Sequence, residues 1–328
     1  MDDRGLLDLI IRRIPGLSYA EQVLLCTKFD READLTVLSR QDIGALIGRN
    51  LRPPTEGRTW TMDGLRNQAE QDAHAARFRG IRYVPYVSSD YPPLLRELFD
   101  PPPVLFYRGC LPDQALPMAA VVGTRRPSGP AAAQAYAIAQ GFAWAGVPVV
   151  SGLALGIDAM AHRGAVEGGG LTIAVLGSGL DEVYPRTNRM LARRIIETGG
   201  ALVSEYPPGT GPMKWHFPAR NRIIAGLSRG TVIVEAPARS GALITAQFAL
   251  EQGRDLWVAS MGVASPTGEG TRKLAADGSR VISAAAAILR EWGIESKSRA
   301  SAGARNCATG AALASSLANS LNIDVEGM

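Results

Sequence analysis

The chain has 328 residues, enough for one large domain and a smaller companion. Its three cysteines include no CxxC pair, which argues against a disulfide scaffold or a zinc ribbon. No apolar run approaches the roughly 18 residues of a membrane span, so no membrane partner is expected. No basic segment precedes an apolar stretch at the N-terminus, so no signal peptide is predicted and a cytoplasmic location is expected. The formal net charge of +4 is unevenly placed. Residues 119–290 hold 17 basic and 11 acidic side chains, which suggests an anionic partner for this block.

The N-terminal part predicts a small helical domain over residues 1–80. Apolar residues recur there at helical spacing, and Ser18 with Glu21 forms a capping box at the start of one helix. The predicted helices cover residues 6–14, 18–29, 39–47 and 62–78. Residues 81–118 are then predicted to be a linker with extension strands at 81–87 and 104–107, separated by proline-rich turns.

Residues 119–290 follow another pattern, in which short apolar runs alternate with alanine-rich helices. Strands that are apolar throughout and separated by helices indicate a parallel sheet covered on both faces. The predicted strands cover residues 119–122, 147–150, 171–176, 201–203, 231–234 and 256–259, and the helices cover 129–145, 157–167, 188–198, 220–227 and 242–253. The predicted fold class is therefore α/β: an extended Rossmann-like, doubly wound parallel sheet with a small N-terminal helical domain. Residues 291–328, rich in Ala, Ser and Asn, are predicted to be a flexible tail.

Small and polar loops follow nearly every predicted strand of this sheet. In open parallel sheets, ligands bind outside the carboxyl ends of the strands, where glycine lets the backbone approach and helix N-termini offer free N–H groups. Five such loops on one edge favour a phosphate-binding rim, although a tight strand-to-helix turn needs glycine in any case. The predicted phosphate-loop residues are Gly123, Thr124, Ser151, Gly152, Gly177, Ser178, Gly179, Asn221, Ser240 and Gly241.

Details of these loops disfavour several ligand classes. No GxxxxGK[ST] motif and no GxSxG elbow occurs, and the dinucleotide fingerprint that begins at Gly177 is broken by Glu182. Asp158 and His162 lie four residues apart on one predicted helix, but no third ligand accompanies them. Neither a metal site nor a cofactor is therefore predicted, and His162 is expected to pack or hydrogen-bond beneath the loop.

The stretch 214–222 interleaves aromatic and cationic side chains. No acidic residue lies between Glu205 and Glu235, whereas four basic residues do. Single-stranded nucleic acid is held by this combination, because cations contact phosphates while bases stack on aromatic rings at about 1–3 kcal/mol each. The alternative interpretation is structural, with Trp215 and Phe217 anchoring a loop and the arginines forming a solvated surface.

Six motifs follow one another along the chain at specific spacing. They are Gly-Thr-Arg from residue 123, Ser-Gly-Leu-Ala-x-Gly-Ile-Asp from 151, Gly-Ser-Gly-Leu-Asp-x-x-Tyr-Pro from 177, Ser-Glu-Tyr-Pro-Pro-Gly-Thr from 204, Phe-Pro-x-Arg-Asn-Arg-Ile-Ile from 217 and Ser-Gly-x-Leu-Ile-Thr-Ala from 240. Together they resemble the DNA-processing protein A family (DprA, also called Smf), and the resemblance runs from about residue 91 to residue 288.

The resemblance implies a non-enzymatic, cytoplasmic bacterial protein that binds and protects incoming single-stranded DNA and loads the RecA recombinase during natural transformation. It also implies a homodimer formed through the Rossmann-like domain and a SAM-like N-terminal domain. By motif match, Arg125 and Lys214 would contact phosphate and Phe217 would stack on a base. Arg220 and Arg222 would widen the basic pocket.

Three features depart from the family pattern. Ile14-Pro15-Gly16 continues as Leu17-Ser18-Tyr19, so the second glycine of a helix-hairpin-helix DNA hairpin is missing and the N-terminal domain is not assigned a DNA contact. Arg272 stands where the family usually has Asn. The residues after Glu295 are too few for the winged helix that ends many members, so its absence is predicted.

Two other functions stay open on the sequence alone. Rossmann-like nucleotide phosphoribohydrolases of the LOG type carry a Pro-Gly-Gly-x-Gly-Thr-x-x-Glu loop, and the corresponding residues 237–245 have lost most of its glycines. A nucleotide-binding sensor would use the same rim for a mononucleotide.

Overall fold

The computed structural model describes residues 3–51 and 61–295. The flexible tail predicted over 291–328 lies outside this part of the chain except for its first five residues, and the predicted absence of a winged helix lies outside it altogether.

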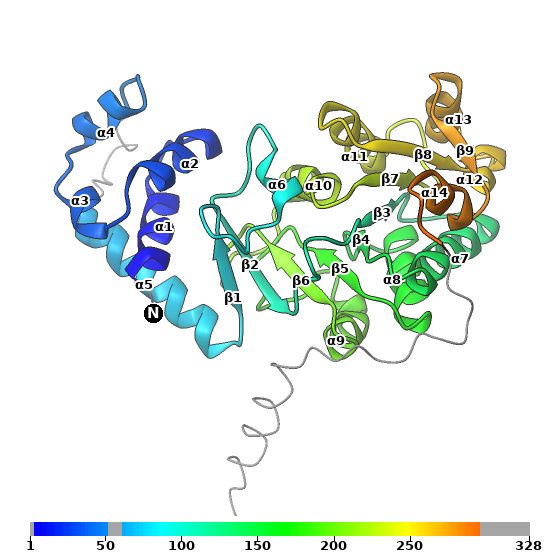
Figure 1. Ribbon diagram of the computed structural model, residues 1–328, viewed down its shortest axis with the longest axis horizontal. Helices are drawn as coiled ribbons and strands as arrows, with labels where there is room; N and C mark the ends of the chain where they lie inside the picture. The colour runs from blue at the N-terminus through cyan, green and yellow to red at the C-terminus, as the bar shows by residue number, and fades with distance from the viewer. Residues whose placement is uncertain (1–2, 52–60, 296–328) are drawn as a thin grey trace, which may run out of the picture.

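Five helices of the described N-terminal part form a layer at one end of the molecule (Figure 1). They are α1 (Asp3–Arg13), α2 (Tyr19–Lys28), α3 (Glu32–Thr36), α4 (Arg40–Leu46) and α5 (Met62–Phe78). The predicted capping box is confirmed, because the Ser18 side chain accepts from the Glu21 N–H and the Glu21 carboxylate accepts from the Ser18 N–H. The short helix α3 was not predicted, since a single turn leaves no periodic pattern to detect.

Nine strands form one sheet in the described chain, in the order β1-β2-β6-β5-β4-β3-β7-β8-β9. They are β1 (Arg82–Pro85), β2 (Val104–Gly109), β3 (Ala119–Val122), β4 (Val149–Ser151), β5 (Thr172–Val175), β6 (Ala201–Ser204), β7 (Gly230–Ile233), β8 (Asp255–Ala259) and β9 (Arg280–Ile282). β1 pairs antiparallel with β2, and β2 pairs antiparallel with β6, whereas the other pairs are parallel. The predicted α/β fold class is confirmed. The strands of the segment 81–118 extend the edge of this same sheet.

Helices cover both faces of the sheet. Ala119 and Val121 of β3 face an apolar cluster with α7, α8 and α14, while Ala120 and Val122 face another with α6, α10 and α11. The helices are α6 (Pro93–Arg96), α7 (Gly129–Trp144), α8 (Ile157–Glu167), α9 (Arg189–Glu197), α10 (His216–Gly226), α11 (Gly241–Glu251), α12 (Ser260–Ala264), α13 (Glu269–Ala276) and α14 (Ala285–Glu291), with a 3₁₀ turn η1 (Arg186–Asn188) before α9. α10 begins about one turn before its predicted start. α6 replaces a predicted turn, because proline fits the first turn of a helix.

The N-terminal layer shares an apolar core with the sheet. Leu9 of α1 belongs to the same buried cluster as Phe106 of β2, and Arg12 donates from Nε and Nη2 to the main-chain oxygen of Glu205 at 3.2 and 2.8 Å. At the other end, Trp292 is buried against Phe142 with 6.4 Å between ring centroids, so the sheet domain continues past the predicted boundary at residue 290. Within residues 3–51 and 61–295, no helix is long and apolar enough to cross a membrane.

Candidate nucleic-acid interface

A pocket of about 350 Å³ opens at the carboxyl edge of the sheet. The loops after β3 and β4, the loop between β5 and η1, and the first turns of α10 build it. It is lined by Arg125, Gly152, Ala154, Leu155, Tyr184, Pro185, Phe217 and Arg220. Aromatic and aliphatic walls thus enclose two guanidinium groups, a composition that suits a flat aromatic ring carrying hydrogen-bond acceptors or a neighbouring negative charge.

Phe217 forms one wall of this pocket. Its ring centroid lies 5.7 Å from the Arg125 guanidinium carbon and 5.5 Å from the centroid of the Tyr184 ring. Gly177 makes room for the ring, since a Cβ there would come within 3.2 Å of the Phe217 Cδ1 atom. The preceding His216 is fixed by a 3.2 Å contact from Nδ1 to the Gly177 oxygen and by stacking on Tyr206 at 3.9 Å. The first turn of α10 therefore presents Phe217 in a fixed position.

Arg220 lies at the base of the pocket and is only 5% exposed. Its Nε donates to Asn221 Oδ1 at 3.0 Å, and its Nη1 donates to the main-chain oxygens of Gly152, at 2.7 Å, and Val175. Its Nη2 has no hydrogen-bond partner among the described residues, and a Cβ at position 152 would collide with it, so only glycine fits there. A guanidinium that keeps unused N–H donors beside a pocket can offer them to a ligand acceptor.

The charge of Arg220 is balanced from below by Asp158. Burial lowers the pKa of Arg220 to about 10, Asp158 opposes this change, and the positive charge of Arg125 adds to it. Burial also raises the pKa of Asp158, while Arg220 and the Ala154 N–H favour its ionised form. The two charges interact electrostatically, although no salt bridge within 4.0 Å joins them, so Asp158 has a structural role beside the loop after β4.

His162 lies under this charge pair in its neutral form. Burial, aided by Arg220, lowers the pKa of His162 to about 3. Thr172 donates from Oγ1 to the Val149 oxygen at 2.7 Å, so its contact with His162 Nδ1 at 2.8 Å is a bond in which the imidazole donates. The expected packed histidine is found. Among the described residues, no group of three or more His, Cys, Asp or Glu side chains is placed to hold a metal ion.

Several predicted phosphate-loop residues hold the loops together and do not line the pocket. Ser151 is buried and donates to the Val121 oxygen at 2.7 Å, and Ser178 is buried beside Gly179. Ser240 accepts from the Ala242 N–H at the start of α11, and Asn221 donates from Nδ2 to the Gly241 oxygen at 3.2 Å. Gly179 is crowded by Pro207 and Asp181. Of the predicted rim, Gly152 lines the pocket and Gly177 supports its wall, and the other residues fix the loop geometry.

The crevice between the loops after β3 and β7 is closed by Glu235. The strand order reverses here, which is where doubly wound sheets usually bind a nucleotide. Ser128, the N-cap of α7, donates from its N–H and Oγ to Glu235 Oε2 at 2.8 and 3.0 Å, and Ser265 donates to Oε1 at 2.6 Å, as does Thr267. Burial raises the pKa of Glu235, but these hydrogen bonds outweigh it and leave the pKa below its ordinary value. A carboxylate of the protein thus occupies the place of a ligand phosphate.

Gly123 and Thr124 belong to this closed crevice. The Thr124 N–H donates to the Glu235 main-chain oxygen at 2.7 Å, and a Cβ at Gly123 would lie 2.6 Å from the Ile157 Cγ1 atom. The tight packing fixes the turn that carries Arg125 to the rim of the neighbouring pocket, where its side chain is exposed.

Arg222 lies away from the pocket, although it was predicted to widen it. Its side chain is 3% exposed and pairs with Glu205 Oε2 at 2.8 Å and Asp100 Oδ2 at 3.0 Å. Tyr19 of α2 lies beneath its guanidinium, 4.7 Å from ring centroid to guanidinium carbon. Its charge is already balanced by two carboxylates, and the residue joins α10 to the N-terminal layer. The prediction of a DNA contact at Arg222 is corrected accordingly.

A family model for DNA recombination-mediator protein A matches residues 82–293. The chain belongs to this family. It is 41% identical over 222 residues to the DNA processing protein DprA of Streptococcus pneumoniae, which covers 67% of this chain and 78% of that protein. It is 49% identical over 172 residues to the protein Smf of Synechocystis, which covers 51% of this chain and 43% of that protein. The resemblance carried by the six motifs is confirmed.

Solved structures of the DprA family have the same fold. The X-ray structure of DprA from Streptococcus pneumoniae superposes with a TM-score of 0.68 at 33% identity, covering 87% of this chain and 96% of that chain. A structure of DprA from Helicobacter pylori, described for its single-stranded DNA binding mode, gives a TM-score of 0.57 at 29% identity and covers 64% of this chain and 95% of that chain.

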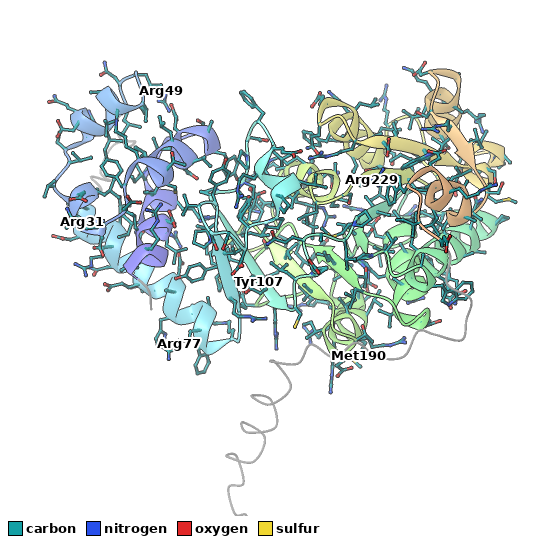
Figure 2. All side chains as sticks on the ribbon, viewed as in Figure 1. Arg31, Arg49, Arg77, Tyr107, Met190 and Arg229 are labelled. Atoms are coloured by element: carbon teal, nitrogen blue, oxygen red, sulfur yellow. The ribbon has the colours of Figure 1, made fainter. Side chains whose placement is uncertain are left out.

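Positive charge on this DprA-family chain is free at Lys214 beside the pocket, whereas two arginines of the N-terminal layer are paired with carboxylates. Lys214 is exposed in the segment before α10 and has no ion pair or hydrogen bond among the described residues. In the layer, where Figure 2 labels Arg31 and Arg49, these side chains pair with Asp34 at 2.8 Å and Glu21 at 2.6 Å. Lys214 therefore offers an unpaired positive charge near the aromatic wall of the pocket.

Sequence reasoning missed four pocket residues, which are Ala154, Leu155, Tyr184 and Pro185. Leu155 and Tyr184 are 46% and 47% exposed, so the mouth of the pocket presents apolar and aromatic surface. A signal was available, because each of the four lies within a motif quoted above. These residues carry no charge, however, so the sequence alone does not mark them as pocket residues.

Proposed function

We propose that this protein binds single-stranded DNA at the pocket, with a base against Phe217 and the flanking phosphates on Arg125 and Lys214. The observation that carries the proposal is that Nη2 of Arg220, in the pocket that Phe217 also lines, has no hydrogen-bond partner among the described residues. The aromatic wall supplies stacking, and the free N–H groups supply donors to a base carbonyl or a phosphate oxygen. An unstacked nucleotide offers both features at once, whereas the bases of a duplex are paired and stacked.

The family supports the wider proposal. The structure of the Helicobacter pylori relative is described for its single-stranded DNA binding mode, and the family is that of a recombination mediator protein. We infer that the chain protects incoming single-stranded DNA, delivers it to the RecA recombinase in natural transformation, acts as a homodimer and does so in the cytoplasm without catalysing a reaction. Its match spans less than half of the Synechocystis relative, so these whole-protein roles are part of the proposal.

Two alternatives have specific features against them. In the loop compared with LOG-type phosphoribohydrolases, the position of the motif's glutamate is taken by Thr245, which is 1% exposed and cannot act as an acid or a base at neutral pH. A nucleotide sensor would use the switch-point crevice, where Glu235 already holds the donors of Ser128 and Ser265. Release of free base from a nucleoside monophosphate would support the enzyme. Tighter binding of a mononucleotide than of an oligonucleotide would support the sensor.

The test compares the double variant Lys214→Ala, Phe217→Ala with wild type in binding a labelled 20-residue oligothymidylate. Losing one stacking interaction costs about 1–3 kcal/mol, and losing a phosphate contact weakens binding further, so affinity should fall by at least tenfold. If about four phosphates are contacted, the wild-type slope of log K against log salt should be near −3. A labelled duplex should bind more weakly than the single strand.

The matched control is Lys28→Ala, Phe78→Ala. Both residues are exposed on the N-terminal helices α2 and α5, so the same side-chain types are removed away from the pocket. The control should bind as wild type does. Full-strength binding by the Lys214 and Phe217 variant would reject the proposed site, and a wild-type protein that binds no oligonucleotide would reject the function.

A further inference from the structure

Trp215 presents a large aromatic surface that the protein does not cover. The side chain is 67% exposed, although it immediately precedes the first turn of α10, which builds the pocket. Two other tryptophans of the described chain, Trp257 and Trp292, are 1% and 8% exposed within the core. An exposed tryptophan forgoes the stabilisation that its burial would provide. Its uncovered ring is available to stack on a ligand.

The backbone under this ring is held firmly while the ring stays open. The Trp215 oxygen accepts from the Ala219 N–H at 3.3 Å, and the His216 N–H donates to the Met213 oxygen at 3.0 Å. The Trp215 ring meets His216 edge-on, with 5.9 Å between centroids and 82° between planes. His216 itself is fixed by Gly177, so Trp215 projects from a rigid base.

The surroundings of Trp215 suit a polyanion that carries flat rings. Lys214, its neighbour in the chain, is exposed and has no ion pair within residues 3–51 and 61–295. No acidic residue occurs between Glu205 and Glu235, so nothing in this segment repels a phosphate. Phe217, two residues further on, already forms the wall of the pocket.

We propose that Trp215 is a second stacking platform for a base of the same single strand, outside the pocket and beside the phosphate contact of Lys214. This inference rests on the proposed function and extends it. The strand is held at two bases, one against Phe217 and one on Trp215. Bases stack on any aromatic face, so the second platform adds affinity without reading sequence.

The test combines affinity with intrinsic fluorescence, because a base stacked on an indole quenches its emission. Wild type, Trp215→Phe and Trp215→Ala are titrated with a 20-residue oligothymidylate, following tryptophan emission and, in parallel, the anisotropy of a labelled oligonucleotide. Trp215→Ala should bind about 5- to 150-fold more weakly. Trp215→Phe keeps a smaller ring, so it should lose less affinity but most of the quenching.

The matched control is Trp144→Phe. Trp144 is 39% exposed at the end of α7, a helix that begins at the carboxyl edge of the sheet and therefore ends at the opposite edge. This variant should keep both the affinity and the quenching of wild type.

The outcomes separate this inference from the proposed function. If Trp215→Ala binds the oligonucleotide as wild type does, or if Trp215→Phe keeps full quenching, the second platform is rejected while binding at the pocket stands. If wild type binds no oligonucleotide, the proposed function itself fails. The thermal unfolding temperature of Trp215→Ala should match that of wild type because the side chain is exposed. If the two temperatures differ, the emission and anisotropy of Trp215→Phe decide whether the second platform exists.

Discussion

Two neighbouring places on the carboxyl edge of the sheet suit an anion, and they are built in opposite ways. At the switch-point crevice, the hydroxyls of Ser128 and Ser265 and the N–H of Ser128 all donate to Glu235. At the pocket, Nη2 of Arg220 has no hydrogen-bond partner among the described residues, and Arg125 is exposed. The crevice is completed by the protein itself, whereas the pocket is left open for a ligand.

The difference shows that a position in a fold does not decide what binds there. Doubly wound sheets commonly bind nucleotides at the switch point, but here Glu235 already accepts the hydrogen bonds of Ser128, Ser265 and Thr267. The donors that remain lie between the loop after β4 and α10, beside aromatic rings. Donors that the protein leaves unsatisfied indicate the site more directly than topology does.

The largest effect is expected when Arg220 is replaced by methionine, because this change removes the guanidinium that lines the pocket. Asp158 then loses the positive charge that favours its ionised form, and the hydrogen bonds of the Arg220 guanidinium are lost as well, so a cost of about 3–5 kcal/mol is expected by comparison with broken buried ion pairs. The free energy of unfolding, measured by urea denaturation, should fall by about this amount. Binding of single-stranded DNA should fall with it.

The double variant Arg220→Met, Asp158→Asn separates stability from binding. With both charges gone, the buried site is neutral, so most of the lost stability should return. The Nη2 donors stay missing, so the affinity for an oligonucleotide should stay low. A double variant that recovers stability and also binds as tightly as wild type would show that Arg220 is only a structural residue.

The fold could be predicted closely because its strands and helices leave strong local signals. Both α5 and α8 have their predicted bounds, since their apolar residues recur at helical spacing over eleven residues or more. The strand β9 was missed, because it has three residues of which only Ile282 is buried. A strand that short and that exposed leaves no apolar run to detect.

The sequence could predict which types of residue form the site, but not the direction in which each side chain points. Arg220 and Arg222 lie two residues apart on α10, which turns them about 200° from each other, so one reaches the pocket and the other reaches Glu205. The role of Glu235 depends on Ser128, more than a hundred residues away in the chain. A local sequence pattern does not predict which distant residue becomes a hydrogen-bond partner in the folded chain.

The second-largest effect is expected from Glu235→Gln, which removes the carboxylate that accepts hydrogen bonds in the crevice. A carboxylate that accepts hydrogen bonds from three side chains becomes an amide that must present donors to some of them, at a cost of about 1–3 kcal/mol in the free energy of unfolding. Single-stranded DNA affinity should stay within twofold of wild type, because Glu235 does not line the pocket. Loss of affinity without loss of stability would contradict the separation of the two places.

The pH dependence of the free energy of unfolding provides a second test of the Glu235→Gln variant. The pKa of Glu235 is lower in the folded protein than its ordinary value, so its ionised form contributes stability above the ordinary pKa of a glutamate. That contribution is lost as the pH falls through the lower folded value. The free energy of unfolding, followed from pH 7 to pH 3, should therefore drop less for Glu235→Gln than for wild type.

The smallest effect is expected from Arg12→Ala, which tests whether the N-terminal layer supports the pocket. Arg12 holds the main chain at Glu205, and the next residue, Tyr206, stacks on His216 beside Phe217. Loosening that support should weaken oligonucleotide binding by about 0.5 kcal/mol, or two- to threefold.

Arg13→Ala is the control for that step, since Arg13 is the next residue of α1 but pairs with Asp72 inside the layer at 2.5 Å. Both variants should lower the free energy of unfolding, because each loses a partly buried guanidinium with carboxylate or carbonyl partners. Only Arg12→Ala should change the affinity for DNA. Equal affinities for the two variants would mean that the layer stabilises the sheet without positioning the first turn of α10.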